Sequence, residues 1–501
     1  MFDNIAAGLG HMAAEPIAIV IFFAALIGGL VFGAIPGLSG ITLAAVLLPV
    51  SVHLSSTNAI MMFAVIYSAA VFGGAITAIL FNIPGDSNNA PTVFDGYPMT
   101  QRGEASLAIG TVIICSALGG AISVVIMMLL IEPIAFWAIR SFGPAEIFSV
   151  VVFGLTVSAG VGASSALKGW LSVGLGLLIA TVGTSPSAGD PRFTFGSIYL
   201  QSGVAFVPLL LGFFAVAEIF NQAHQRVDSA AKQMGRISVE LPGLVEFWRQ
   251  KLVFLRSLVI GFITGLLPGA GATLAAFVSY SETVRWSKHP ERFGKGELAG
   301  VVAPETANNT ATGAAMIPLL AVGIPGGALT AIMLAAFQMH GLQPGPLLLI
   351  SNSNLVWVVM VAMLLANVAI LALGYVQTRY AILLLKVPFP ILGAGILVVS
   401  IIGAFAIRNS AFDVWVMFVA GAVGYLMRRS GYSTAGLVLG VILGGIGENA
   451  FVQAMTTLNY DILGLFRRPI AALLMAAAAL ALGHSIYRGW RELRQQPAAA
   501  D

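Results

Sequence analysis

Several apolar stretches of this sequence are broken by glycine and proline, and small polar residues lie beside the breaks. The breaks are Gly33–Gly40, Leu267–Gly271 and two Ile-Pro-Gly triplets, Ile83–Gly85 and Ile324–Gly326. A broken helix at membrane depth leaves backbone N–H groups free to bind an anion and C=O groups free to bind a cation. Glycine permits the turn, and proline removes a donor that would otherwise stay unpaired.

These breaks and their polar neighbours are the candidate binding residues. We expect the substrate-binding residues to be Pro36, Gly37, Ser39, Gly40, Pro268, Gly269, Gly271, Thr273, Asn88, Asn89, Asn308 and Asn309, and the cation-binding residues to be Asn82, Asp86, Thr310 and Gly326. Neutral hydroxyl and amide groups suit carboxylate oxygens and Na+ without adding a fixed charge. The same residue types also join membrane helices structurally, and that alternative stays open for each of them. No catalytic residue and no metal other than Na+ is expected.

The composition shows what kind of protein must position these residues. Of 501 residues, 58% are hydrophobic and 9% are charged, and the mean hydropathy is +0.94. These values exceed those of soluble globular proteins. Apolar runs of about 20 residues indicate membrane helices and not the alternating strands of a barrel. We therefore predict an all-α, polytopic membrane protein with about 10–12 transmembrane helices. No basic domain suggests a nucleic-acid partner.

The segment between Arg256 and Arg285 has an unusual pattern. It is too short for two spans of about 20 residues each, and basic residues, which mark the cytoplasmic face, lie at both of its ends. Its centre is broken at Pro268. These features predict a re-entrant helical hairpin at about 256–285, whose tip lies in protein or lines a cavity, because irregular backbone is tolerated only there. One long helix kinked at Pro268 is the alternative.

The order of elements repeats along the chain. Each half has a Pro-Gly hairpin and then a run that closes on Ile-Pro-Gly; Pro268 follows Pro36 by 232 residues, and Pro325 follows Pro84 by 241. Internal repeats of this kind are typical of secondary transporters. We predict repeat 1 at 1–221 with a hairpin at about 16–53, a cytoplasmic linker at 222–255, and repeat 2 at 256–450 with a hairpin at about 256–285. A further transmembrane helix and tail follow at 451–501.

The charges indicate that the two repeats have opposite orientations. No Lys or Arg occurs before Arg102, whereas the second hairpin is basic on both flanks, so the hairpins should open toward opposite faces. We therefore predict inverted-topology repeats. In this topology some arginines fall on the outer side, against the positive-inside rule: Arg140, Arg192, Arg408, Arg467 and Arg468.

The ordered set of motifs resembles a known family. Besides the breaks already described, it includes Asp95–Pro98, Pro304–Asn309 and His340–Pro346. Together these motifs resemble the large membrane subunit of tripartite tricarboxylate transporters, the TctA family. In place of the Thr-Pro that is common in the family after the first Ile-Pro-Gly, this chain has Asp86–Asn89, and Gly327 stands where Ser is frequent after the second.

The resemblance implies a permease of the bacterial inner membrane, without enzymatic activity or cofactor. Its expected partners are a small membrane subunit (TctB-like), a periplasmic solute-binding protein (TctC-like), membrane lipid and a small organic anion. Uptake of a dicarboxylate, a tricarboxylate or a related acid would be driven by a cation gradient, with Na+ expected and H+ as the alternative. Paired hairpins favour an elevator motion.

Two other classes of function are considered. Gly37–Gly40 fits the Gly-x-Ser-Gly motif of rhomboid-type intramembrane serine proteases, which would require a histidine within hydrogen-bond reach of Ser39. A passive anion channel is the second alternative, because backbone breaks at depth also build selectivity filters. A primary pump is not expected, since the sequence has no phosphate-binding Gly-x-x-x-x-Gly-Lys-Ser/Thr loop.

Overall fold

The computed structural model describes residues 2–35, 37–159, 163–185, 189–224, 244–269, 271–384 and 389–495. In these ranges the regular secondary structure is helical apart from one short strand pair. In this pair, β1 (Gly183–Thr184) is antiparallel to β2 (Pro191–Arg192). This confirms the predicted all-α, polytopic architecture. Much of the predicted linker at 222–255 lies outside the described residues.

Nine helices in the described ranges are long and apolar enough to cross a membrane. They are α2 (Pro16–Ala34), α4 (Ser56–Phe81), α6 (Ala105–Ser141), the continuous run of α10 (Phe206–Leu210), η2 (Leu211–Val216) and α11 (Ala217–His224), α18 (Ser353–Leu384), α19 (Phe389–Arg408), α20 (Ala411–Arg429), α21 (Thr434–Thr457) and α23 (Pro469–Gln495). Shorter helices complete the bundle: α1 (Phe2–Ala14), α3 (Gly40–Ser51), η1 (Ser87–Asn89), α5 (Ala90–Gln101), α7 (Pro144–Ala159), α8 (Ala166–Ala180), α9 (Ile198–Gln201), α12 (Leu244–Arg249), α13 (Lys251–Leu266), α14 (Gly271–Trp286), η4 (Pro290–Arg292), α15 (Ala299–Val322), α16 (Ala328–Met339), α17 (Pro346–Ser351) and α22 (Gly464–Arg467).

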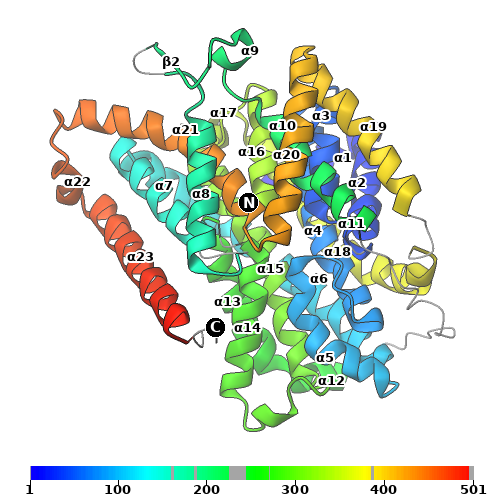
Figure 1. Cartoon of the computed structure of the whole chain (residues 1–501). Helices are drawn as coiled ribbons and strands as arrows, with labels where there is room; N and C mark the ends of the chain where they lie inside the picture. Colours follow the sequence, from blue (N-terminus) through cyan, green and yellow to red (C-terminus); the bar gives the residue numbers. More distant parts are fainter. Residues whose placement is uncertain are drawn as a thin grey trace, which may run out of the picture.

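Both predicted hairpins are present. Hairpin 1 consists of α2 and α3, and hairpin 2 consists of α13 and α14. In each hairpin the two helices pack against each other, so the chain reverses at Pro268 and does not continue as one kinked helix. Figure 1 shows α3 in the upper half of the molecule and α14 in the lower half. This arrangement supports hairpins that open toward opposite faces.

The centre of the molecule is formed by α4 and α15. Nearly every residue of both helices is buried, as expected for helices that are surrounded by protein. Helix α4 packs on α2 of hairpin 1, and α15 packs on α13 of hairpin 2. Small residues allow this close approach: a Cβ atom on Gly33 would lie 2.3 Å from the Ala70 carbonyl oxygen, and one on Gly261 would lie 2.4 Å from that of Ala307.

The two halves of the chain follow the same order of packed elements. Hairpin 1, α4, a first break (residues 82–89), α5 and α6 correspond to hairpin 2, α15, a second break (residues 323–327), α16 and α18. The halves also interlock, because α15 packs on α6 and α4 packs on α18. This order supports the inverted repeat, which remains our proposal for the orientation in the membrane.

Each repeat forms hydrogen bonds with the end of the hairpin of the other repeat or with the loop that follows it. Asp95 on α5 accepts hydrogen bonds from the backbone N–H groups of Gly296 and Glu297, at 2.9 and 2.8 Å, and Arg102 donates to the Lys295 carbonyl at 2.6 Å. At the end of α16, the Nε2 atom of His340 lies 3.1 Å from the carbonyl oxygen of Ser51, the last residue of hairpin 1. Contacts between the repeats therefore position the C-terminal ends of both hairpins or the residues that follow them.

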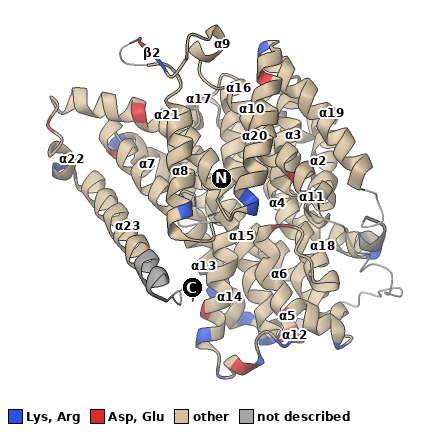
Figure 2. Cartoon of the chain, in the orientation of Figure 1, with Lys and Arg blue, Asp and Glu red and all other residues tan. Residues whose placement is uncertain are grey.

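Four of the five arginines that oppose the positive-inside rule are paired with carboxylates. The pairs are Arg192–Glu448 at 2.8 Å, Arg468–Glu146 at 3.1 Å, Arg467–Asp461 at 3.3 Å and Arg408–Asp413. Figure 2 shows acidic beside basic residues around β2 and the upper end of α20. A paired arginine costs less to hold in a polytopic protein than a free one, so these residues do not require a different topology.

The close contact between α13 and α15 generates a prediction about stability. Replacing Gly261 with Ala should lower the thermal stability of the detergent-solubilised chain, at a cost of about 1–3 kcal/mol, because the new methyl group would collide with the α15 backbone. Gly174→Ala on α8 is the matched control, since no atom lies within 4 Å of its Cβ position. Alanine favours a helix over glycine at both sites, so an equal or higher melting temperature in Gly261→Ala would contradict this packing.

A candidate anion-binding site between the hairpin tips

A cavity of about 160 Å³ lies where the two hairpin tips and the two breaks meet. We call it the central cavity. Hairpin 1 contributes Gly40, hairpin 2 contributes Gly269 and Gly271, and the second break contributes Gly327. The first break contributes Asp86–Asn88. The two tips therefore border one site, although 231 residues separate Gly40 from Gly271 in the sequence.

Three α-helices begin at the central cavity. They are α3 at Gly40, α14 at Gly271 and α16 at Ala328, and all three of these residues line it. The first turn of a helix has backbone N–H groups without an intrahelical partner, and its dipole places partial positive charge there. No Lys, Arg or His is among the described residues that line the cavity. Attraction for an anion would therefore come from the backbone and not from cationic side chains.

Side chains of both repeats meet at one wall of the cavity. The Thr273 hydroxyl of hairpin 2 donates to Asn88 Oδ1 at 2.5 Å and lies 3.1 Å from the Ser87 hydroxyl of the first break. These groups can turn their hydroxyl hydrogens toward a bound oxygen atom. The wall thus connects hairpin 2 with the first break through hydrogen bonds that a ligand could share.

Asp86 is the one charged residue among the described residues that line the central cavity. Its Oδ1 atom accepts hydrogen bonds from the Ser87 backbone N–H at 2.6 Å and from the Ser87 hydroxyl at 3.1 Å. Its Oδ2 atom lies 3.3 Å from the Asn88 amide nitrogen, which donates to it. No ion pair of Asp86 occurs within the described ranges, so a cation could bind here without displacing a basic residue.

The turn of hairpin 2 requires glycine. Gly269 and Gly271 have φ angles of +80° and +62°, which side chains rarely allow. A Cβ atom on Gly269 would also lie 1.9 Å from the Ser158 hydroxyl of α7. Pro268 packs beside Gly154 of the same helix. The tip of hairpin 2 is therefore seated on α7, which holds Gly271 at the cavity.

The tip of hairpin 1 packs differently. Gly37 has a φ of +84°, and a Cβ atom there would lie 2.7 Å from Glu218 Oε1 on α11. Ser39 caps α3, because its hydroxyl accepts a hydrogen bond from the Thr42 N–H at 3.2 Å. The side-chain hydrogen bonds of Ser39 in the described residues involve Thr42 alone, and no histidine is in reach. This geometry gives the serine-protease alternative no catalytic base.

The structure brings together some of the predicted residues and not others. Of the predicted substrate-binding residues, Gly40, Asn88, Gly269, Gly271 and Thr273 line the central cavity. Gly37, Ser39, Asn89, Pro268, Asn308 and Asn309 lie outside its lining, and Pro36 lies outside the described residues. Asn89, Asn308 and Asn309 are buried, and each donates a hydrogen bond to a backbone carbonyl. The acceptors are the carbonyl oxygens of Val71, Asn88 and Glu305, respectively.

The predicted cation-binding residues do not form one cluster around the cavity. Asp86 lines it, whereas the other three lie elsewhere. Asn82 ends α4 in the left-handed conformation, with a φ of 59°. Thr310 donates to a carbonyl of its own helix, that of Thr306, at 2.7 Å. Gly326 packs against Ala315, since a Cβ atom there would lie 2.9 Å from the alanine methyl group. Binding of a cation by any of the four stays a prediction.

Several lining residues were not among the predicted ones. Ser87 lies between two predicted residues, and Gly327 follows another, so both could have been predicted from their position at the breaks. Tyr67 and Ser158 lie within apolar runs on α4 and α7 and reach the cavity only through packing. No pattern in the sequence distinguishes these two from the helix-joining polar residues around them.

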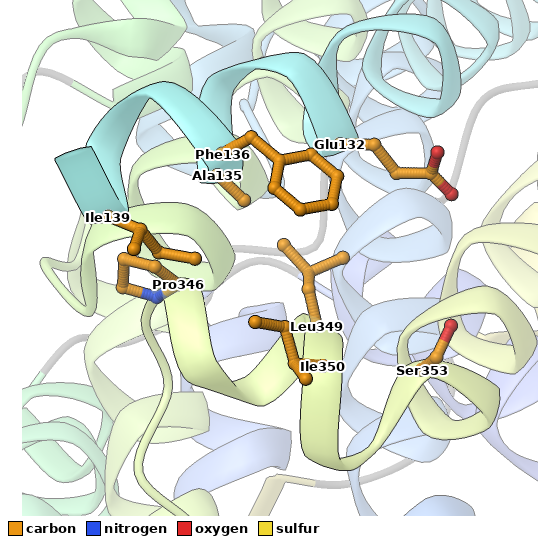
Figure 3. Close-up of a pocket in the computed structure, with 8 residues that line it drawn as sticks. All are labelled: Glu132, Ala135, Phe136, Ile139, Pro346, Leu349, Ile350 and Ser353. Carbon is orange, nitrogen blue, oxygen red and sulfur yellow. The ribbon is translucent and has the colours of Figure 1, made fainter.

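A second hollow, of about 320 Å³, lies between α6 and α17. Figure 3 shows Phe136 and Ile139 of α6 opposite Leu349 and Ile350 of α17, with the Glu132 carboxylate at one end. Its walls are mostly apolar, and Glu132 would repel an anion just as Asp86 would in the central cavity. The central cavity is the better candidate for a small anionic ligand, because hydroxyl and amide side chains of both repeats meet at one of its walls.

The contact between hairpin 2 and the first break can be tested by cross-linking. With the native Cys115 replaced by Ser, the pair Ser87→Cys and Thr273→Cys should form a disulfide on oxidation, because the native hydroxyl oxygens are 3.1 Å apart. Ser87→Cys with Thr42→Cys is the control, since Thr42 instead donates to the Phe214 carbonyl. Mass spectrometry of linked peptides measures both, and equal linkage in the two pairs would refute the arrangement.

Comparison with known proteins bears on the identity of the chain. Residues 19–439 match the family described as "Tripartite tricarboxylate transporter TctA family". An Agrobacterium vitis protein described as "Uncharacterized 52.8 kDa protein in TAR-I ttuC' 3'region" is 35% identical over 483 residues, which cover 95% of this chain and 94% of that protein. Another, described as "Uncharacterized protein in TAR-II ttuC' 3'region", is 34% identical over 236 residues, 47% of this chain and 98% of the relative. No solved structure matches. The chain, a multi-pass membrane protein, belongs to the tripartite tricarboxylate transporter TctA family.

Proposed function

We propose that this chain is the permease subunit of a secondary-active system for the uptake of a small carboxylate, and that the central cavity binds the substrate. The observation that carries the proposal is the convergence of three α-helix N-termini on one cavity that has no cationic residue among the described residues that line it. Membership of a transporter family supports the transport role. The substrate class, the coupling and the site residues are part of the proposal.

The proposed binding mode uses the backbone first. The carboxylate oxygens accept hydrogen bonds from free N–H groups where α3, α14 and α16 begin, and the hydroxyls of Thr273 and Ser87 complete the shell. Hydrogen bonds to a charged acceptor are stronger than neutral ones. Since no fixed positive charge holds the anion, it can also leave on the opposite side of the membrane.

Asp86 has a separate role in this proposal. Its carboxylate would repel an anion in the same cavity unless a cation accompanied the substrate. We assign the coupling cation to Asp86, with Na+ expected and H+ as the alternative. A hard cation prefers carboxylate and hydroxyl oxygens, which Asp86 and Ser87 supply.

Alternating access follows from the arrangement of the hairpins. Their tips border one cavity while α3 and α14 extend toward opposite ends of the molecule (Figure 1). In the proposed cycle the site opens to one face and then to the other, by an elevator motion of the hairpin-bearing core. Transport through a passive channel would need no such alternation.

The proposed setting is the bacterial inner membrane. There the chain would work with a TctB-like small membrane subunit and a TctC-like periplasmic solute-binding protein, embedded in lipid and without nucleic acid. A binding screen of small carboxylates against the partner solute-binding protein would identify the substrate, because that subunit should set specificity. Counterflow in proteoliposomes then separates the classes: exchange that saturates indicates a carrier, and unsaturable flux indicates a channel.

The turn of hairpin 2 generates a prediction about transport. Gly269→Leu should abolish uptake without preventing membrane insertion, because its side chain cannot adopt the native φ and would collide with Ser158 at the cavity. Uptake by the complex in proteoliposomes and the amount of inserted protein are the measurements. Gly174→Leu on open α8 surface serves as the control. Normal uptake in Gly269→Leu would refute the proposed site.

Asp86 generates a prediction about coupling. In Asp86→Asn the oxygen and nitrogen atoms of the amide replace the carboxylate, so the Na+ dependence of uptake should be lost while carboxylate exchange continues. Uptake driven by a Na+ gradient is compared with counterflow in the same vesicles. Unchanged Na+ dependence in Asp86→Asn would remove Asp86 from the coupling mechanism.

A further inference from the structure

Glu305, near the start of α15, is a carboxylate at the centre of the protein. It is 0% exposed and is therefore enclosed by protein on all sides. Asn89 Nδ2 donates to its Oε1 atom at 3.0 Å, and the Thr92 hydroxyl donates to the same atom. Asn308 Nδ2 makes one long hydrogen bond to Oε2, at 3.4 Å. No Lys, Arg or His in the described part of the chain forms an ion pair with it.

A buried carboxyl group whose hydrogen-bond donors are all neutral can take up a proton, because nothing nearby among the described residues compensates its negative charge. A buried charge without a counter-charge costs several kcal/mol, and neutral hydrogen bonds offset only part of this cost. The surrounding cluster also has acceptors to spare, because Asn89 Oδ1 and Asn309 Oδ1 have no hydrogen-bond partner among the described residues. One added proton on Glu305 would remove the charge and would turn one of its acceptor oxygens into a donor.

The other titratable groups around α15 do not neutralise Glu305. On the elements packed against it they are Cys115, Glu132 and Arg140 on α6, Tyr67 on α4, Asp86 before η1, Asp95 and Tyr97 on α5 with Arg102 just after it, Tyr280, Glu282 and Arg285 on α14, and Lys251 and Arg256 on α13. Arg102 binds the loop before α15, and Arg256 lies over the Trp286 ring at 5.1 Å. Asp95 is bonded to Tyr280 at 2.9 Å. Asp86 and Asp95 are acidic and therefore cannot compensate the charge of Glu305.

Comparison of the two repeats shows that packing does not require this charge. Counted back from each Ile-Pro-Gly, the position of Glu305 on α15 corresponds to Ala64 on α4, which is also fully buried. The equivalent central helix thus packs with an apolar side chain at this position. The carboxylate occurs in one of the two repeats only, which indicates a role other than filling the core.

Glu305 is connected to the central cavity by a single residue. Asn308 bonds both to Glu305 and, at 3.2 Å, to the Asn88 carbonyl oxygen. The side chain of Asn88 lines the cavity and bonds to Thr273. A negative ligand in the cavity therefore raises the affinity of Glu305 for a proton, because like charges repel. By linkage, a proton on Glu305 raises the affinity of the cavity for the anion by the same factor.

We propose that Glu305 is a proton-binding residue of the transport cycle, which takes a proton from the uptake side when the carboxylate enters and releases it to the cytoplasm when the carboxylate leaves. This rests on the proposed transport function and adds a proton to the cation at Asp86. The reaction is the protonation of one carboxylate oxygen to a carboxylic acid and its reversal, so no other reactant is needed.

Proton binding can be measured without any substrate. Infrared difference spectra of the full chain in nanodiscs, recorded across pH, should show a protonated-carboxyl band that disappears in Glu305→Gln. Thr92→Val should shift the titration of that band to higher pH, because the charged form loses a donor. Thr378→Val on α18 is the matched control, since that buried hydroxyl donates only to its own helix, at Gly374. A band that persists in Glu305→Gln, or an unshifted titration in Thr92→Val, overturns the assignment.

Coupling is measured in proteoliposomes of the complete complex with a pH-sensitive dye inside. Addition of the carboxylate selected by the solute-binding protein should acidify the lumen of wild-type vesicles, and Glu305→Gln should lose the acidification while retaining counterflow. Equal acidification in both refutes a role in coupling. If no carboxylate is transported by any variant, the proposed function fails, whereas proton binding at Glu305 is still decided by the infrared titration.

Discussion

Every backbone N–H and C=O group inside a membrane must find a partner within the protein, and this constraint governs the whole architecture. Broken helices are tolerated at the two hairpin tips and the two breaks because protein surrounds them. Helices α4 and α15 are buried along almost their entire length and shield the breaks from lipid. The glycines at the helix contacts allow this shielding to be tight, as at Gly33 and Gly261. The N–H groups that remain free point to the central cavity, where a ligand can take the place of protein acceptors.

The distribution of charge follows from the same constraint. Most carboxylates deep in the bundle have a basic partner, such as Glu146 with Arg468 and Glu218 with Arg428. Asp86, Asp95 and Glu305 differ, because they form no ion pair within the described ranges and their hydrogen-bond donors there are neutral. Asp95 binds the loop before α15, whereas Asp86 belongs to the first break and Glu305 contacts it. Two of these three carboxylates thus lie beside the site proposed for an anion, which is how cation and anion binding become linked.

Much of the fold could be predicted from the sequence, and the reasons are local. Proline and glycine at Pro268–Gly269 and at the Ile-Pro-Gly triplets specify where helices stop, whatever packs around them. The spacing between equivalent prolines predicted corresponding elements, and the structure has them in the same order. The seating of Gly269 on Ser158 could not be predicted, because it depends on how α7 packs against the tip.

The candidate site was predictable in outline and not in its details. Residues in the breaks reach the cavity by their position in the chain, as Asn88 and Thr273 do. Asn89 is adjacent to Asn88 but faces the interior, since one step along the 3-10 helix η1 turns a side chain by about 120°. Glu305 lies close in sequence to a basic loop, and no pattern in the sequence shows that it is buried. Its burial depends on Asn89 and Thr92, which come from the other repeat.

An anion site that is formed by helix N-termini depends little on the identity of the side chains that surround it. The positive potential at the central cavity belongs to the peptide groups of α3, α14 and α16, which every amino acid except proline carries in the same form. Replacing side chains one at a time would leave that potential in place, so an alanine scan would register the turns and the packing but miss the groups that attract the anion. Homologous chains can therefore exchange most of the residues around this cavity and still keep an anion site, provided that the helices begin at the same places.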